Sequence, residues 1–438
     1  MSNTVMIIAL VIGLILSLVI STKFSINAGI LGLIVAWIVG GWMGKLSVTT
    51  LVGYWPTSVM FIAITTTLFF GVARENGTLT LFANKIMYAT RKFPWFIPIA
   101  LYLTSWVVGA AGAGAMAAQI SLSAIGFAIA AQTGMHPLLV ILAVFLGGGG
   151  GGGMFWSSEG ANRIAFYTQT GLSDEVVSYS AIAYSVYSFI LFTILFLIGY
   201  VVFKGWKINT AELNMEKPAP YDRQQRSTLI LIAVCLILVI GSALWKCFWP
   251  SELSKYLAGQ LSIQMVCLAG FVVAFFLKLA DSKAVMKRIP WDLILNIGGM
   301  CVMIKVLINC GITDMVADVF AGDIPKIVIP VLFFIMAGVI TLFSNFTVIY
   351  PLLMPLVPVV AAAAGCNSVT LFTAMCLGSF TPGISPFSTG GACCLSGCPD
   401  EKMRQELIPK QFIMSLVIIA VVCILLLTPL VGFFPDVL

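Results

Sequence analysis

Charge is scarce in this sequence. Only 9% of its 438 residues are Asp, Glu, Lys or Arg, whereas 60% are hydrophobic. About a quarter of the residues in a typical soluble domain are charged, so the composition excludes an ordinary water-soluble protein. The chain also has a single histidine, and no intramembrane His, Asp or Cys residues have the spacing of a catalytic group. We therefore expect no enzyme.

Long apolar runs fill most of the chain. A run of about 17 to 25 residues crosses the roughly 30 Å hydrocarbon core of a bilayer. The sequence thus predicts an all-α integral membrane protein, multi-pass in the plasma (inner) membrane, with about ten full crossings and two interrupted segments. The net charge of +6 gathers in loops, which indicates orientation in lipid and no nucleic-acid partner. The clearest runs are 5–20, 26–43, 58–73, 176–203, 229–249, 261–277, 291–310 and 407–433.

The chain carries one pattern twice. Pro56 and Gly77 recur at one common offset as Pro290 and Gly311, and a second group of positions recurs at a slightly shorter offset. Internal repeats are typical of membrane transporters, whose sites lie where the repeats meet. We predict a first repeat half over 1–204, a cytoplasmic linker over 205–226 and a second half over 227–438. The second group pairs Gly134, Gly147, Ser157-Ser158 and Gly160 with Gly365, Gly378, Ser388-Thr389 and Gly391.

The two halves are predicted to have inverted topology. Five apolar crossings separate Pro56 from Pro290, and an odd number reverses the side from which the second copy enters the membrane. The loop charges agree, because basic residues dominate 74–92 whereas acidic residues dominate the equivalent 311–326. Basic loops stay in the cytoplasm, so these two loops are expected on opposite sides.

Each half contains a segment that is too irregular for one continuous helix. Small residues at 109–114 interrupt the stretch 94–133, and the polar group at 343–347 interrupts the stretch 327–364. We interpret both stretches as re-entrant hairpins. Irregular backbone at membrane depth survives only where protein or a water-filled cavity satisfies it, so the hairpin tips are expected to line a site.

A broken helix follows each hairpin. The first, over 138–170, is predicted to break at the seven consecutive glycines 147–153. The second, over 368–398, is predicted to break at 378–391, which is rich in Gly, Ser, Thr and Pro. A glycine run can also mark tight helix packing, but its alignment with the second break favours an interruption.

Both breaks end in hydroxyl residues at the start of a new helix. Such a start exposes unpaired backbone N–H groups and the positive end of the helix dipole, which favour an anion. We therefore predict substrate-binding residues on either side of these helix starts. They are Ser157, Ser158, Asn162, Ser385, Ser388 and Thr389.

The second hairpin tip has the side chains for a second kind of ligand. Ser344, Asn345 and Thr347 are short polar residues that suit both a cation and the substrate anion, although a satisfied polar turn is the alternative. Backbone at Gly378 and Ser379 completes this predicted cation site.

The first hairpin tip offers backbone groups alone. Gly112 and Gly147 would form a weaker second cation site, with Gly114 facing the substrate. The predicted site is therefore asymmetric.

Glu159 and Arg163 are four residues apart on a predicted helix and can pair with each other. One interpretation is a structural ion pair. The other makes Arg163 the counter-charge of the substrate and Glu159 a proton acceptor, because a charge near the bilayer centre costs about 3 kcal/mol or more. Both interpretations remain open at this point.

The plan of two hairpins in inverted repeats resembles the ion transporter superfamily. It is closest to the divalent anion/sodium symporters and the MatC-type malonate and dicarboxylate carriers. The stretch from Gly53 to Gly77 is similar to the MatC amino-terminal region, and Ser344-Asn345-Phe346-Thr347 resembles the symporters' Ser-Asn-Thr tip with one residue inserted. Ser385-Pro386-Phe387-Ser388 resembles a Ser-Pro-x-Ser pattern of the MatC type. The first tip departs from the symporter pattern, since Ala113-Gly114-Ala115 replaces Ser-Asn-Thr.

The resemblance implies a secondary transporter for a small dicarboxylate such as malonate or a C4 acid. Substrate would bind between the hairpin tips, with Na⁺ as coupling ion, H⁺ as the alternative, and no other cofactor. The implied assembly is a homodimer in the lipid bilayer. The rival interpretations are a cation/proton antiporter or an oxyanion permease on the same scaffold, and more remotely a channel.

Overall fold

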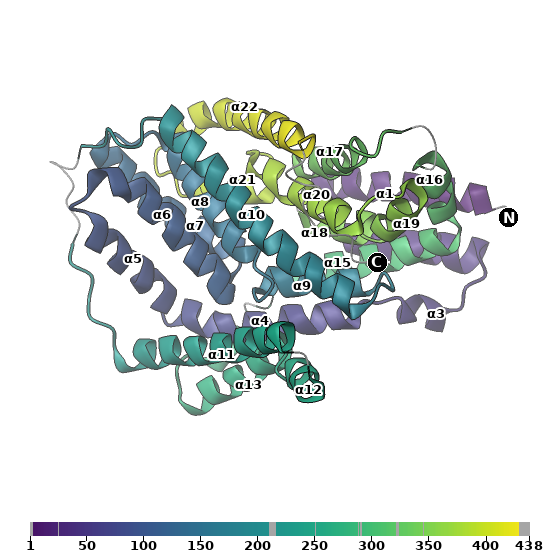
Figure 1. The fold of residues 1–438 in the computed structure, drawn as a ribbon, viewed down its shortest axis with the longest axis horizontal. Coiled ribbons are helices and arrows are strands. Elements are labelled where there is room, and N and C mark those ends of the chain that lie inside the picture. The colour runs from purple at the N-terminus through teal and green to yellow at the C-terminus, as the bar shows by residue number, and fades with distance from the viewer. Residues whose placement is uncertain are drawn as a thin grey trace.

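The computed structural model describes residues 3–24, 26–209, 216–249, 251–287, 289, 291–320, 324–344 and 346–428. Helices are the only regular elements in these ranges (Figure 1), so the predicted all-α class is confirmed. They form two sets that follow the same order. The first set is α1 (Asn3–Phe24), α2 (Ala28–Ala36) with η1 (Trp37–Met43), α3 (Val48–Gly53), α4 (Thr57–Glu75), α5 (Thr78–Thr90), η2 (Pro94–Phe96), α6 (Ile97–Val108), η3 (Gly109–Ala113), α7 (Ala115–Thr133), α8 (Pro137–Gly152), α9 (Ser158–Thr168) and α10 (Asp174–Val202). The second set is α11 (Arg223–Phe248), α12 (Glu252–Gln260), α13 (Ile263–Phe276), α14 (Ser282–Lys287), α15 (Trp291–Asn309), α16 (Ile312–Phe320), α17 (Ile329–Thr341), α18 (Phe346–Leu353), α19 (Leu356–Ala364), α20 (Ser368–Phe380), η4 (Thr381–Ile384), α21 (Thr389–Ser396) and α22 (Glu401–Leu426).

Equivalent helices of the two sets begin at the positions that the repeated sequence pattern matches. Helix α4 begins directly after Pro56, and helix α15 begins directly after Pro290. Helices α9 and α21 begin at Ser158 and Thr389, the matched hydroxyl residues of the two breaks. Figure 1 places α5 and α16, which follow α4 and α15, at opposite ends of the long axis of the molecule. The two sets therefore run in opposite directions, as inverted repeats do.

The two sets are interlocked. Helix α2 packs against α15, and helix α13 packs against α4, so each set supplies one helix to the other. A Cβ atom added to Gly29 of α2 or to Gly299 of α15 would collide with the backbone of the facing helix. At the equivalent contact, Gly270 of α13 lies against the ring of Phe69 on α4. Small residues allow membrane helices to touch at their backbones, and here they join the two halves.

Helix length limits how many elements can cross a bilayer. Among the described residues, seven helices are long and apolar enough to span a membrane, and two bent pairs raise the number to nine. We expected about ten full crossings, each of roughly 20 residues. Four further apolar helices among the described residues contain only 10–17 residues and fall below this length. One of them, the 16-residue α8, is about 24 Å long, which is shorter than the roughly 30 Å hydrocarbon core.

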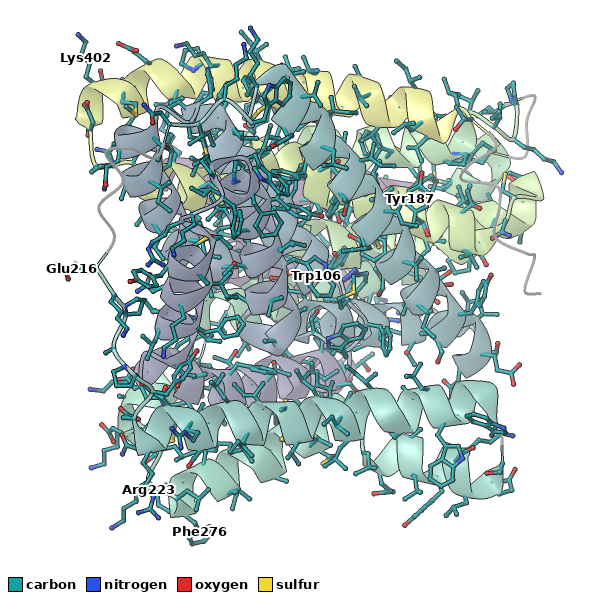
Figure 2. The ribbon with its side chains drawn as sticks, turned by 60° about the vertical axis from the view of Figure 1, so that its left-hand side comes forward. Trp106, Tyr187, Glu216, Arg223, Phe276 and Lys402 are labelled. Atoms are coloured by element: carbon teal, nitrogen blue, oxygen red, sulfur yellow. The ribbon has the colours of Figure 1, made fainter. Side chains whose placement is uncertain are left out.

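The predicted break at the seven glycines is wrong. Helix α8 continues through the run to Gly152, and the chain leaves helical structure only between Gly153 and Ser157. The glycines are part of the helix, and their lack of a side chain lets neighbouring helices pack closely against it. A Cβ at Gly147 would collide with the backbone of Tyr102, and a Cβ at Gly151 with the backbone of Trp106, which lies in the middle of the molecule in Figure 2. Tight packing, the alternative interpretation, is therefore correct.

The second break also begins later than predicted. Helix α20 includes Gly378 and Ser379 and ends at Phe380, and the irregular stretch covers 381–388. Gly378 has the same packing role as Gly147, since its Cβ would collide with the backbone of Phe334 on α17. In each half, a glycine thus lets the broken helix, α8 or α20, pack directly against the first helix of the hairpin, α6 or α17.

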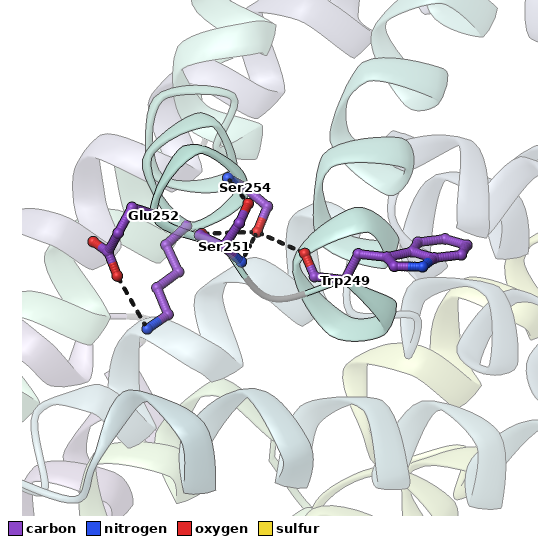
Figure 3. A network of polar contacts seen from close by, with 5 residues as sticks. Trp249, Ser251, Glu252 and Ser254 are labelled. Carbon is purple, nitrogen blue, oxygen red and sulfur yellow. Dashed lines mark hydrogen bonds and ion pairs between the residues drawn. The ribbon is translucent and has the colours of Figure 1, made fainter.

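The turn between α11 and α12 is held by a compact polar network (Figure 3). Ser251 and Ser254 cap α12 reciprocally: the Ser254 N–H donates to Ser251 Oγ at 3.1 Å, and the Ser251 N–H donates to Ser254 Oγ at 2.8 Å. Ser254 Oγ also donates to the Trp249 carbonyl oxygen at 3.1 Å. The Trp249 side chain is 71% exposed, which is typical of an aromatic residue at a lipid–water interface. Lys255 pairs with Glu252 at 3.6 Å on the same turn.

We predict that Gly151→Ala lowers the melting temperature of the purified protein. The added methyl group collides with the Trp106 backbone, and overpacking of this kind costs about 1–3 kcal/mol. Gly241→Ala on α11 is the control, because its Cβ meets nothing within 4 Å and alanine gains about 1 kcal/mol of helix propensity over glycine. Thermal unfolding in detergent compares the two variants. Equal melting temperatures would contradict the close contact at Gly151.

Candidate functional site

Each helix that follows a break is bonded to the hairpin tip of its own half. In the first half, Ser158 Oγ donates to the Gly112 carbonyl oxygen at 3.3 Å. In the second half, Ser388 Oγ donates to the Ser344 carbonyl oxygen at 2.8 Å. Four of the residues predicted from the sequence are therefore brought together, two in each half. The irregular backbone of each tip is satisfied by a hydroxyl group from the facing helix start.

Ser157 is the N-cap of α9 and is fully buried. Its hydroxyl group donates to the Met154 carbonyl oxygen at 2.8 Å and accepts from the Gly160 N–H at 3.0 Å. A cap of this type satisfies one of the unpaired N–H groups at a helix start. The bonding capacity of this hydroxyl is thus used within the break.

The Glu159 carboxylate lies at the N-terminus of α7. Its Oε1 atom accepts a hydrogen bond from the Ala115 N–H at 2.8 Å. Gly114 makes this contact possible, because its φ of +83° is strained for any residue with a side chain. Gly152 also leaves room, since a Cβ there would lie 2.6 Å from Glu159 Oε2. A carboxylate is stabilised at this position by the positive end of the helix dipole.

The Arg163 guanidinium group lies at the opposite kind of helix end. It is only 3% exposed, and its two terminal nitrogens donate to the carbonyl oxygen of Gly153, the C-cap of α8, at 3.4 and 3.2 Å. The group also stacks over the Tyr184 ring at 4.0 Å. Its Nε atom has no hydrogen-bond partner. A cation at a helix C-terminus is favoured by the dipole.

The ion pair between Glu159 and Arg163, one of the two interpretations left open by the sequence, does not form. Both residues are described, and no ion pair joins them. The reason is that each group lies beside a helix end whose partial charge is opposite to its own. The carboxylate bonds to the first amide of α7, whereas the guanidinium group bonds to the last carbonyl of α8.

A small cavity lies between the two halves. Its water-accessible volume is about 10 Å³, which is close to the space needed for one water molecule. Side chains of α7, α8, α17 and α20 and the second break surround it. Lining residues from both halves include Gln119, Phe145, Thr341, Ser379, Ser388 and Gly390.

Gln119 was not identified from the sequence. Its side chain is 1% exposed, and its Oε1 atom is buried without a hydrogen-bond partner. A buried acceptor without a partner costs about 1–3 kcal/mol, so its retention in this cavity favours a ligand. The only signal in the sequence was one polar residue in an otherwise apolar stretch, four positions after Ala115.

The cavity presents acceptor oxygens on one side. Each hydroxyl group has one proton, and the three lining hydroxyls donate theirs to carbonyl oxygens away from the cavity. Ser388 donates to Ser344, Ser379 to Cys376 at 2.7 Å and Thr341 to Ala337 at 2.9 Å. Their lone pairs, with Gln119 Oε1, suit a cation.

The start of α21 provides donors to the same cavity. Ser388 is the N-cap of α21, but its side chain accepts no cap bond from that helix. Its hydroxyl proton goes to the Ser344 carbonyl oxygen at the hairpin tip. The first amides of a helix have no partner within the helix. An anion beside Gly390, at this helix start, would therefore meet unpaired N–H groups and the positive dipole end.

The other predicted residues are more scattered. Ser385 is buried in the second break, where its Oγ accepts from the Phe387 N–H at 3.3 Å. Thr389 is exposed at the first position of α21. The Oδ1 atom of Asn162 is buried in α9 without a partner. Asn345 and the side chain of Thr347 lie outside the described residues.

The single histidine has a local structural role. His136 is the N-cap of α8, where its Nδ1 atom accepts from the Leu138 N–H at 3.2 Å, and its ring stacks on Phe203 at 4.5 Å. Burial, with a smaller contribution from Lys410, lowers the pKa of His136. The imidazole is therefore neutral at pH 7 and accepts a hydrogen bond from the backbone.

Two family models together match nearly the whole chain. The N-terminus of the dicarboxylate carrier protein MatC matches residues 1–152, and the transmembrane region of the sodium:sulfate symporters matches residues 172–432. Among solved structures, the chain is similar to the crystal structure of the YdaH transporter of Alcanivorax borkumensis, described as having an unusual topology. The TM-score is 0.62 at 14% sequence identity, over 90% of this chain and 89% of that chain. No curated protein matches the sequence.

We predict that Glu159→Ala lowers the melting temperature, because it leaves the buried Ala115 N–H without an acceptor, at a cost of about 1–3 kcal/mol. Glu159→Gln keeps a carbonyl acceptor and is expected to lie between Glu159→Ala and the wild type. The exposed Glu406, in α22, provides the control variant Glu406→Ala. A melting temperature of Glu159→Ala that equals that of Glu406→Ala would disprove the stabilising contact.

Proposed function

This chain belongs to the sodium:sulfate symporter family, and we propose that it is a cation-coupled carrier of a small dicarboxylate anion such as malonate or a C4 acid. Membership of a transporter family makes it a membrane transporter and not an enzyme. The match of residues 1–152 to the N-terminus of the dicarboxylate carrier MatC supports a dicarboxylate as the substrate. We place its action in the plasma (inner) membrane, where a homodimer is our working assembly.

The cavity between the two halves is the observation that carries this proposal. One side offers the amides at the start of α21, and the other offers lone pairs from Gln119, Thr341 and Ser379. Groups that suit an anion and groups that suit a cation therefore lie side by side. Transporters with repeats bind substrate and coupling ion at such a junction of broken helices.

Coupling is needed on electrostatic grounds. A charge that moves against a membrane potential of 100 mV costs about 2.3 kcal/mol, so a dianion entering a cell that is negative inside costs roughly 4.6 kcal/mol. Cations bound with the substrate remove this cost. We propose Na⁺ as the coupling ion, on the basis of the family, with H⁺ as the alternative.

Binding requires the two halves to separate. The cavity has room for about one water molecule, whereas small-molecule sites are typically larger than about 300 Å³. We propose that the hairpins around 94–133 and 327–364 are re-entrant and that alternating access opens the site to one side at a time. Ser344 and Ser388 then hold the ligands at the second tip, together with Asn345 and Thr347.

Transport assays in proteoliposomes test the function directly. We expect labelled malonate or succinate to accumulate when an inward Na⁺ gradient is imposed at matched pH and membrane potential. Labelled sulfate is the second substrate to test, because the family of residues 172–432 includes sodium:sulfate symporters. Accumulation driven by protons but indifferent to Na⁺ would move the coupling to H⁺. Uptake of sulfate alone, or of none of the three, would refute the dicarboxylate assignment.

We predict that Ser388→Ala reduces Na⁺-driven uptake at least tenfold. The variant loses the hydrogen bond to the Ser344 carbonyl oxygen, and it also loses one oxygen atom that lines the cavity. Each of these two interactions is worth about 1 kcal/mol. Ser396→Ala is the matched control, since Ser396 is exposed on the same helix and donates only to Cys393. Asn345→Ala should likewise abolish uptake while membrane insertion persists. Wild-type rates in both Ser388→Ala and Asn345→Ala would remove the second tip from the site.

A further inference from the structure

The two halves differ in charge at equivalent positions beside their breaks. With the offset that matches Ser158 to Thr389, Glu159 of the first half corresponds to Gly390 of the second, and Arg163 corresponds to Cys394. The helix that follows the first break therefore carries a carboxyl group and a guanidinium group, whereas the equivalent positions after the second break carry neither. The second break also differs in structure, since it contains a 3₁₀ helix over Thr381–Ile384 and is formed by uncharged residues.

Arg163 occupies the kind of position at which transporters bind a coupling cation. Carbonyl groups at the C-terminal end of a broken helix coordinate such ions, and the guanidinium group bonds to that end of α8 through Gly153. In the second half, the equivalent carbonyl of Ile384 accepts from the neutral Gln411 side chain at 2.7 Å. A fixed cation is thus present in the first half only.

Burial makes this arrangement costly. Arg163 is 3% exposed, and the Glu159 carboxyl group acts on its charge only from beyond ion-pair distance. A charged side chain inside a membrane is rare and costly and usually marks an ion or substrate pathway. Glu159 in turn occupies the amide at the first hairpin tip, where a mobile anion would otherwise bind.

We infer that Arg163 and Glu159 are tethered substitutes for the ions of the first half, so that this half binds no mobile cation and the chain binds one Na⁺, in the second half. The inference rests on the proposed function and specifies its ion stoichiometry. A dicarboxylate that carries one proton then crosses with one Na⁺ without net charge.

Direct counting of bound ²²Na⁺ on the purified full-length protein tests the inference. We expect saturation at one Na⁺ per chain. In Arg163→Ala, we expect a second Na⁺ to bind, because the carbonyl end of α8 is no longer occupied. Millimolar guanidinium should return the variant to one Na⁺, whereas urea, a neutral molecule of the same shape, should not. A purely structural role for Arg163 would not change the count.

Two controls keep the outcome unambiguous. Arg404→Ala removes an arginine that pairs with Glu401 at the start of α22, and it should leave one Na⁺ per chain. If Arg163→Ala does not fold, the wild-type count still decides: two Na⁺ per chain, or none, overturns the inference. A count that stays at one in folded Arg163→Ala overturns it as well. One bound Na⁺ without any dicarboxylate uptake would instead refute the proposed function and leave the inference intact.

Discussion

A peptide group inside a bilayer has no water to bond with, so each helix end that lies there must find its partner in the protein. This constraint accounts for three polar side chains at the broken helices. Glu159 serves the start of α7, Arg163 serves the end of α8, and Ser388 serves the carbonyl at the second hairpin tip. A transporter needs broken helices to create a site, and these few side chains make the breaks tolerable.

The two repeat halves share one scaffold, and they differ in the polar groups at their broken helices. The two helix sets share order, offset and glycine contacts at the broken helices. They differ where ligands would bind: Ser157 caps α9 with its own hydroxyl, whereas Ser388 leaves the start of α21 uncapped. The start of α9 is therefore capped by a side chain, and the start of α21 is not.

The general plan was readable in the sequence, and the contacts were not. Glycine and proline often interrupt regular backbone, so Gly134 and Gly365 marked the ends of the segments that precede the broken helices. The same reasoning failed at Gly147–Gly153, because glycine also permits close helix packing and only the facing backbones of Tyr102 and Trp106 decide between the two roles. Spacing alone likewise paired Glu159 with Arg163, since it takes no account of the helix ends beside them. Gln119 was missed because its importance depends on residues far away in the chain.

The exchange of helices between the two sets has a consequence for how the protein is made. Helix α4 ends at Glu75, but its partner α13 begins only at Ile263. At roughly 5 to 20 residues per second, a ribosome takes on the order of ten to forty seconds to supply it. During that interval the lipid, or a membrane chaperone, must cover the face of α4 that Gly270 later occupies. Biosynthesis in which translation stops between the halves would therefore leave an incomplete first half exposed to proteolytic quality control.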